Sequence, residues 1–419
     1  MVIKESSSTP ASLRRTHRGL MLSRIQARPG VSRADLARNF GFSEMAATRI
    51  ARDLLGAGII EEFDLPEAEG DAPRRIGRPK IGLRINAEGV YAAGITVSAY
   101  YSEVSICDAN GRTVARREVA NSEFRDVEAT ARLYADALLS LIAETGIDAA
   151  RIVGVGVALS ARTAPDSTES LRSEYFGWAD DGGRFWREIR RHTRLPVMIE
   201  NIANALAIAE MRFGVARETS EFALVHVATF AGVGAVSDSR IVRGASGDAG
   251  GIGHFRAVGT DLRCTCGRND CLNLSATGFS ILSRLGALDH AAFDPSRLPH
   301  YAASLVRAVG ERDNAPAIRA AGRNLAAALD PLAKLLAPEM IVLSGILGAD
   351  DAYVAGAEAA LTDTYGYGAR SRFRLVQGQI LPSEAAALLA LHTFCYSDRL
   401  DFERLNDTAD GDLGGTAYA

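Results

Sequence analysis

The segment that most constrains this chain is a run of cysteines: three of its five cysteines lie between positions 264 and 271. An odd total crowded in this way is poorly suited to a disulfide framework and favours a metal site in a reducing compartment. Cys264 and Cys266 are two residues apart, and Gly267 permits the tight turn that returns Cys271 to the same ion. With His254 upstream, three thiolates and one imidazole would give a closed tetrahedral set, the arrangement of structural zinc. The alternative is three reduced, buried thiols beside an unrelated histidine.

The length of 419 residues predicts two or three domains, and a hydrophobic fraction of 47% is typical of a globular protein. No apolar run approaches the ~20 residues of a membrane span, and the N-terminus has no apolar signal-peptide core. We therefore expect a cytoplasmic protein with no membrane partner. Residues 1–85 hold 15 Lys+Arg and 10 Asp+Glu, a net of +5, whereas the whole chain carries −4, which leaves −9 for the rest. A basic head on an acidic body indicates a nucleic-acid-binding module, although a solvated basic face would have the same composition.

Within the basic head, apolar residues recur at helical spacing. Ser32 can cap a short helix over residues 33–39, and Gly41 interrupts it. Ser43 can then cap a second, longer helix that runs to about Ala57. Two short helices joined by a glycine-containing turn predict a helix-turn-helix, whose second helix would enter the major groove of DNA.

Short strand-like runs at 59–63 and 81–85 predict a wing behind these helices, with a basic loop between them. Arg78 of this loop could enter a minor groove, where negative potential attracts arginine. A flexible basic linker is the alternative. The predicted DNA contacts come from the helices and this loop: Arg33, Ser43, Glu44, Ala47, Thr48, Arg49, Gly77, Arg78 and Lys80.

Beyond residue 86 the chain alternates between strand-like and helical runs, which predicts an α/β body with a largely parallel sheet. The turn at 108–111 between successive strands adds an antiparallel hairpin at the front. More than 300 residues exceed one hydrophobic core, so we expect two lobes with a cleft between them. The predicted units are a DNA-binding domain at 1–85, a small lobe at 86–200 with 375–400, a large lobe with the zinc site and an oligomerisation surface at 201–374, and a disordered tail at 401–419. The strand-like runs are 91–97, 104–108, 152–159, 197–200, 223–227 and 340–344, and the helical runs are 127–145, 202–212 and 322–336.

Residues 250–254, followed by 264–272, resemble the zinc signature of the ROK family (repressors, open reading frames and sugar kinases). The head resembles the winged helix-turn-helix of the family's repressor branch, the xylose and N-acetylglucosamine regulators. This resemblance spans roughly residues 15–395. It implies a winged helix-turn-helix followed by a two-lobed, actin-like ATPase fold with a structural zinc, and a homodimer or homotetramer.

The same resemblance shows which kinase residues this chain lacks. Family kinases bind ATP through Asp-x-Gly-Gly-Thr after the first strand, but Thr96 stands in the place of that aspartate. The second phosphate loop of the kinases is Gly-Thr-Gly-x-Gly, and Ala228 and the bulky Phe230 replace its first two glycines. Ile202 replaces the aspartate that acts as general base on the sugar, and an isoleucine cannot accept a proton. Catalytic residues are therefore absent, and no enzymatic activity is expected.

Sugar-binding carboxylates of the family are also replaced, by Ile202, Gly251 and Asn273. Because each charged hydrogen bond contributes ~1.5–3 kcal/mol, their loss disfavours an ordinary hexose. The cleft would then bind a different, less polar effector, or nothing. Its predicted lining is Tyr175, Trp178, Asn201, His254 and Asn273, with a core position as the alternative for Trp178.

Together these observations predict a DNA-binding transcriptional regulator, a repressor, that binds inverted-repeat operators in double-stranded DNA as an oligomer. An effector closing the cleft would shift the protein away from its DNA-binding state. Two alternatives stay open. One is a ligand-independent regulator whose body only forms oligomers or binds a partner protein, and the other is an active ROK sugar kinase of carbohydrate metabolism.

Overall fold

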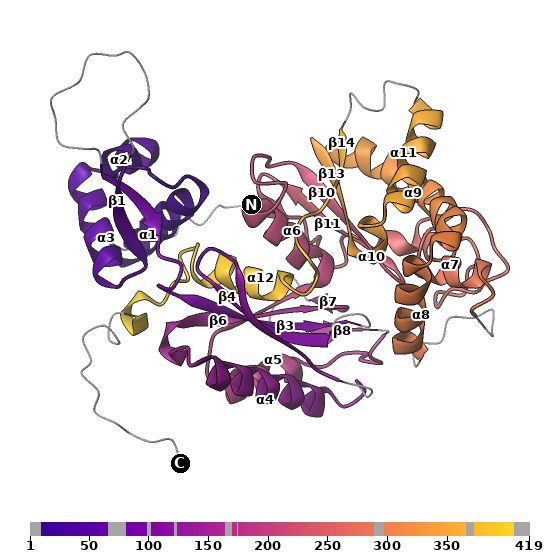
Figure 1. Ribbon diagram of the computed structural model, residues 1–419, viewed down its shortest axis with the longest axis horizontal. Helices are drawn as coiled ribbons and strands as arrows, with labels where there is room; N and C mark the ends of the chain where they lie inside the picture. The colour runs from indigo at the N-terminus through magenta and orange to yellow at the C-terminus, as the bar shows by residue number, and fades with distance from the viewer. Residues whose placement is uncertain are drawn as a thin grey trace.

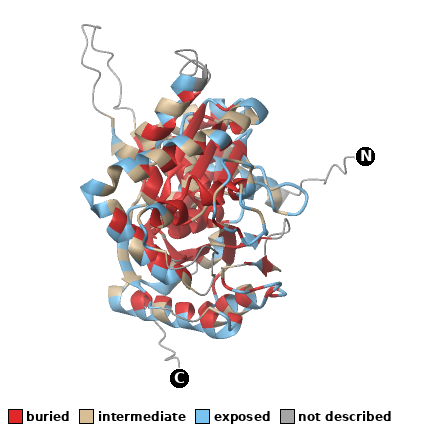
Figure 2. Cartoon of the chain, turned by 90° about the vertical axis from the view of Figure 1, so that its right-hand side faces the viewer, coloured by how far each residue is buried: buried red, intermediate tan, exposed pale blue. Residues whose placement is uncertain are grey.

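The computed structural model describes residues 10–65, 81–98, 102–120, 124–163, 170–173, 175–288, 297–365 and 373–405. They form a small head and a two-lobed body (Figure 1). Buried residues gather in the centre of the body, and the outer helices expose one face (Figure 2). Among these described residues, no helix combines the length and apolar content that a bilayer span requires.

The head consists of three helices and a two-stranded antiparallel sheet: α1 (Pro10–Ala27), α2 (Arg33–Phe40), α3 (Glu44–Gly56), β1 (Ile60–Asp64) and β2 (Ile81–Ile85). These elements match the predicted helix-turn-helix and the strands of the wing.

Local capping explains where the head helices begin and end. Ser32 and Asp35 form a reciprocal capping box, in which the backbone N–H of Ser32 donates to the Asp35 carboxylate at 3.2 Å. Gly41 ends α2 in the left-handed region, with φ of 67°. The Ser43 hydroxyl then accepts a hydrogen bond from the backbone N–H of Ala46 at 3.1 Å, which starts α3.

The small lobe is built on a five-stranded sheet in the order β5-β4-β3-β6-β9. One face is covered by α4 and α5 and the other by α12, which also packs against α6 (Ile202–Phe213) of the large lobe (Figure 1). A two-stranded ribbon, β7-β8, follows β6. The bounds are β3 (Tyr91–Val97), β4 (Ser102–Asp108), β5 (Thr113–Glu118), β6 (Ile152–Leu159), β7 (Arg162–Thr163), β8 (Leu171–Arg172), β9 (Val197–Asn201), α4 (Val127–Thr145), α5 (Arg184–Thr193) and α12 (Ala385–Phe394).

The large lobe is built on a second five-stranded sheet in the order β12-β11-β10-β13-β14. Alternate residues of β10 face opposite layers: Leu224 joins the core beside α6, and Val225 joins the core beside α9. The bounds are α6 (Ile202–Phe213), β10 (Phe222–Val227), β11 (Ala231–Ser237), β12 (Arg240–Ile241), α7 (Gly278–Arg284), α8 (Leu298–Gly310), α9 (Ala315–Leu336), β13 (Met340–Ser344), α10 (Gly345–Gly348), α11 (Asp351–Tyr365) and β14 (Arg374–Gln377).

Both sheets are mixed. The predicted antiparallel hairpin around the turn 108–111 is confirmed as β4-β5, whereas the antiparallel strands of the large lobe were not predicted. The strands β3-β6-β9 and β10-β13-β14 run parallel, whereas β5-β4-β3 and β12-β11-β10 are antiparallel. The physical reason is the short connection between successive strands at the start of each lobe, which permits only a hairpin. Strand β14 also belongs to the large lobe, so the chain returns to the small lobe after residue 377 rather than at residue 375.

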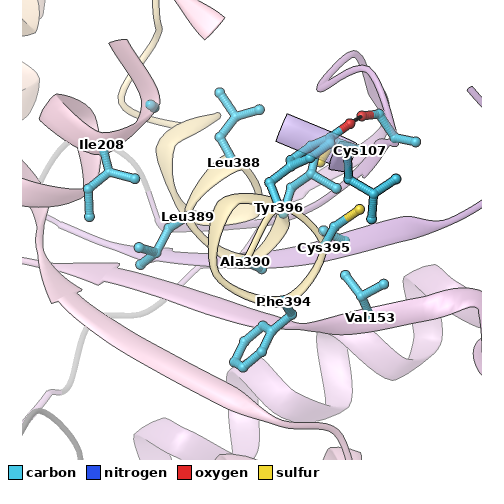
Figure 3. Packing of buried hydrophobic residues seen from close by; sticks show 14 of the residues in the cluster. Cys107, Val153, Ile208, Leu388, Leu389, Ala390, Phe394, Cys395 and Tyr396 are labelled. Carbon is cyan, nitrogen blue, oxygen red and sulfur yellow. Dashed lines mark hydrogen bonds between the residues drawn. The ribbon is translucent and has the colours of Figure 1, made fainter. Parts of the chain in front are cut away.

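Helix α12 lies unusually close to the small-lobe sheet because the facing strand positions are glycines. A Cβ atom on Gly156 would lie 1.9 Å from the carbonyl oxygen of Ala386, and one on Gly94 would lie 2.4 Å from the backbone nitrogen of Ala387. The alanines of α12 complete this close contact, and Leu388, Leu389 and Phe394 fill the space around it (Figure 3).

A continuous hydrophobic core joins the head to the body. Met21 of α1 belongs to the same buried cluster as Leu389 of α12 and Tyr396. The Ser23 hydroxyl donates to the carbonyl oxygen of Tyr396 at 2.9 Å. Leu405 is also fully buried in this cluster, which corrects the start of the predicted tail: residues 401–405 pack against the protein. Residues 406–419 lie outside the described chain.

Candidate functional site

The exposed face of α3 is the surface of the head that can contact DNA. It consists of Glu44, Met45, Thr48, Arg49 and Arg52, which follow one another at helical spacing. Arg52 was not predicted, although its position three residues after Arg49 could have indicated it. Ala47 is fully buried in the head, so its predicted contact with DNA is wrong: the helix turns this residue inward. Ser43 caps α3 at the exposed end of this face.

Of the other predicted DNA contacts, Arg33 lies beside the wing. Arg33 at the start of α2 forms an ion pair with Glu62 of β1, so its guanidinium ties the helices to the wing. Gly77, Arg78 and Lys80 lie outside the described residues. Of these four predicted contacts, the structure therefore places only Arg33.

The predicted metal ligands come together in the large lobe. The ligand atoms of His254, Cys264, Cys266 and Cys271 all lie within 4.8 Å of one another. The Sγ of Cys264 is 3.4 Å from Nδ1 of His254, and the Sγ atoms of Cys266 and Cys271 are 3.3 Å apart. Tetrahedral zinc with Zn–S and Zn–N bonds of about 2.0–2.3 Å requires ligand separations of roughly 3.3–3.8 Å. The donor set fits zinc, two of the ligand separations lie in this range, and none exceeds 4.8 Å.

Two local features bring the sulfur atoms of this cluster together and favour their thiolate form. Gly267 adopts φ of 84°, and its N–H donates to the carbonyl oxygen of Cys264 at 2.9 Å, which is the tight turn that the spacing predicted. The backbone N–H of Arg268 lowers the pKa of Cys266 by hydrogen bonding to its sulfur, which favours the thiolate. The Arg268 guanidinium also donates to Sγ of Cys271 at 3.3 Å.

A cavity of about 400 Å³ lies between the lobes. Its lining includes four of the predicted effector residues, namely Tyr175, Asn201, His254 and Asn273. Tyr175 stacks on Phe230, with ring centroids 5.0 Å apart, so an aromatic pair joins the lobes across the cleft. Asn201 caps α6 through the N–H of Ala203 at 2.9 Å.

Two predicted effector residues have structural roles. Trp178 is 4% exposed, does not line the cavity, and its indole N–H donates to the carbonyl oxygen of Phe124 at 2.6 Å. Its assignment to the effector site is wrong, and the core alternative holds. Asn273 lines the cavity, but its side-chain oxygen accepts from the N–H of Ala231 at 3.1 Å and so positions the turn between β10 and β11.

The residues that replace kinase groups stand at the cavity or beside it. Ile202 is buried at the start of α6 and lines the cavity, so no proton acceptor occupies that position. The neighbouring Glu200 is also buried, and it accepts hydrogen bonds from Arg243 at 3.0 Å and Asn204 at 3.2 Å. Thr96 is fully buried in β3, and its hydroxyl has no hydrogen-bond partner among the described residues.

His226 of β10 also lines the cavity, although nothing in the sequence singled it out. Its buried Nδ1 has no hydrogen-bond partner among the described residues. Burial lowers the pKa of His226 to about 4, so the ring is neutral at physiological pH. A neutral imidazole here can donate or accept one hydrogen bond to a ligand.

Several known proteins are similar to this chain. The xylose repressor of Bacillus subtilis is 24% identical over 273 residues, which is 65% of this chain and 68% of the repressor. The DNA-binding transcriptional dual regulator NagC of Escherichia coli is 23% identical over 377 residues, 86% of this chain and 88% of the regulator.

Solved structures share the fold. A ROK family transcriptional regulator, described as a homologue of the E. coli MLC protein, superimposes with a TM-score of 0.73 at 21% identity and covers 94% of this chain and 100% of its own. A ROK family glucokinase from Streptomyces griseus, in complex with glucose and AMPPNP, gives a TM-score of 0.58 at 20% identity over 72% of this chain and 98% of its own. The sequence profile of the ROK family matches residues 92–385, more than half of the chain. The chain therefore belongs to the ROK family.

Proposed function

We propose that this protein is a transcriptional repressor that binds operator DNA through α3 and the wing, and that its kinase-like body senses a ligand instead of transferring phosphate. The observation that carries the proposal is the exposed face of α3, where Thr48, Arg49 and Arg52 stand free to reach bases and phosphates. The similarity to a xylose repressor and to a DNA-binding transcriptional dual regulator supports it.

The residues that line the cleft support the absence of kinase activity that we propose for the body. A phosphoryl-transfer enzyme needs a group that accepts the substrate proton and a loop that admits the phosphates. Ile202 cannot accept a proton, and the ring of Phe230 stacks on Tyr175 inside the cleft. Turnover of ATP in the presence of any sugar would contradict this part of the proposal.

Zinc is the metal that we assign to the cysteine cluster. Its residues, His254, Cys264, Cys266 and Cys271, are four protein ligands, so no coordination position stays open for chemistry. When bound, the ion would cross-link the two turns that carry these residues. It would thereby hold His254 at the edge of the cavity.

A homodimer or homotetramer is the assembly that we propose for DNA binding. A two-fold oligomer places two copies of α3 in successive major grooves, about 34–36 Å apart, on an inverted-repeat operator. Such a regulator would act in the cytoplasm, the compartment that the sequence predicts. A ligand-independent regulator is the second candidate, because replaced carboxylates weaken a sugar site.

Genome-wide mapping of bound DNA, followed by gel retardation on the recovered fragments, tests this function. We expect Arg49→Ala and Arg78→Ala to weaken binding by about tenfold or more, since each removes a cation that we propose contacts DNA. Arg117→Gln is the control, because this arginine pairs with Glu144 on the body. Binding that is unchanged in both head variants, or absent from all double-stranded fragments at low salt, would overturn the proposal.

A further inference from the structure

Met45, the second residue of α3, is the most exposed large hydrophobic residue in the part of the chain that the structure describes, at 83%. Apolar surface left in water gives up the roughly 25 cal/mol per Å² that burial would return. Single exposed apolar residues are nevertheless common on protein surfaces. The exposure of Met45 is therefore informative only together with its neighbours.

The neighbours of Met45 on α3 are cations. Arg49 and Arg52 follow it at i+4 and i+7, so the three exposed residues form one line along the helix. At a rise of 1.5 Å per residue, the two arginines lie about 6 and 10 Å further along the axis. Ala47 and Ile50 are buried on the other side, which fixes the direction of this line. An apolar protein partner would have to cover both guanidinium groups, which is costly, whereas a polyanion with an apolar group at one point suits the whole line.

The turn before α3 fixes the backbone that carries Met45. The ring of Phe42 stacks on His17 of α1, with ring centroids 3.8 Å apart, and on Phe40, with ring centroids 5.4 Å apart. Ser43 then caps the helix with a hydrogen bond of 3.1 Å. A methionine side chain is flexible and polarisable, so on this fixed backbone it can adjust to a small apolar group presented to it.

Glu44 indicates which part of a DNA duplex this end of α3 suits. The residue is exposed and directly precedes Met45. An acid in the first turn stabilises any helix through the macrodipole, but it also repels phosphate groups. The edges of cytosine and adenine, in contrast, carry amino groups that donate to a carboxylate. The start of α3 therefore suits the base edges, and the arginines further along suit the phosphates beside them.

We propose that Met45 is a specificity-determining residue that recognises one thymine in each half-site by packing against its C5-methyl group. That methyl is the apolar group that the base edges present in the major groove, and cytosine lacks it. This inference rests on the proposed function, because it names the base that α3 reads within an operator.

Replacing thymine by deoxyuridine removes the methyl group and leaves every hydrogen-bonding group of the base pair. In a fragment recovered by the genome-wide mapping, thymines are replaced one at a time, at the symmetric positions of both half-sites. The affinity of the full-length protein is measured by gel retardation. We expect one position at which deoxyuridine weakens binding by about three- to fivefold per half-site, the value of burying one methyl group.

Variants assign that effect to Met45. Met45→Ala should bind the thymine operator more weakly by a similar factor and should bind the thymine and deoxyuridine operators equally at that one position. Met45→Leu keeps an apolar side chain and should keep the preference for thymine. Both variants should retain the wild-type Tm, because the side chain is exposed in the free protein. Leu335→Ala is the matched control: Leu335 is 77% exposed on α9 of the large lobe, and its removal should change neither affinity nor preference.

The inference is overturned if no thymine methyl affects the affinity of the wild type, or if deoxyuridine weakens Met45→Ala as much as it weakens the wild type. In both cases the protein still binds its operator, so the proposed function stands. Protein that binds no double-stranded fragment contradicts the proposed function itself, and the role of Met45 falls with it.

Discussion

Cys266 is the exposed member of the cluster that we assign to zinc, so its substitution disturbs packing little and coordination strongly. We expect Cys266→Ser to lose bound zinc and to lower Tm by roughly 5–10 °C, because a structural metal contributes directly to folding free energy. Metal analysis and thermal unfolding measure both effects. Thr265→Ala is the control, since it changes the neighbouring residue and leaves every ligand. Wild-type protein that contains no metal and keeps its Tm in a chelator would contradict the assignment.

The chemistry of single residues could be predicted from the sequence where spacing alone brings groups together. The three cysteines meet because eight consecutive residues with Gly267 can form only a small loop. The direction of a side chain could not be predicted in the same way. Ala47 lies one residue from exposed Thr48, and only the phase of α3 against the head core decides which of them faces DNA.

The position of helix α12 against the small-lobe sheet depends on glycines of that sheet. We expect Gly156→Ala to destabilise the protein by about 1–3 kcal/mol or more, because its Cβ would overlap the carbonyl oxygen of Ala386 and backbone cannot yield as a flexible side chain does. Chemical denaturation measures the free energy of unfolding. Gly310→Ala is the matched control, since a Cβ there meets no atom within 4 Å. Equal stability of the two variants would show that α12 is not in close backbone contact with β6.

The bounds of long helices and strands with a clear apolar pattern could be predicted from the sequence. Helix α4 has the bounds expected from its apolar spacing, and β3, β6 and β13 are also placed as expected. The two-residue strands β7 and β8 carry no periodic signal, because each spans only one repeat of the two-residue strand pattern. Arg162 and Arg172 face each other only in the register of this ribbon, so their pairing could not be predicted from the sequence.

On the scale of the whole molecule, the head and the small lobe are held together by the segment that follows α12. Gly19 of α1 packs directly on the backbone of Ser397, where a Cβ would lie 2.5 Å from its carbonyl carbon. The Tyr396 hydroxyl donates to the carbonyl oxygen of Ala109 in the small lobe, and the carbonyl of Tyr396 accepts from Ser23 in the head. A change in the angle between the lobes that moves α12 would therefore carry α1 with it.

Leu405 tests this connection because it is the last described residue and is fully buried in the core shared by head and body. We expect Leu405→Ala to reduce the free energy of unfolding by about 2–5 kcal/mol through the cavity that it leaves. If the shared core positions the head, operator affinity also falls, whereas zinc content is unchanged because the metal cluster lies in the other lobe. Denaturation, gel retardation and metal analysis report these three quantities. Leu335→Ala is the control, since Leu335 is 77% exposed. Full operator affinity in a clearly destabilised Leu405→Ala protein would mean that the head binds DNA without guidance from the body.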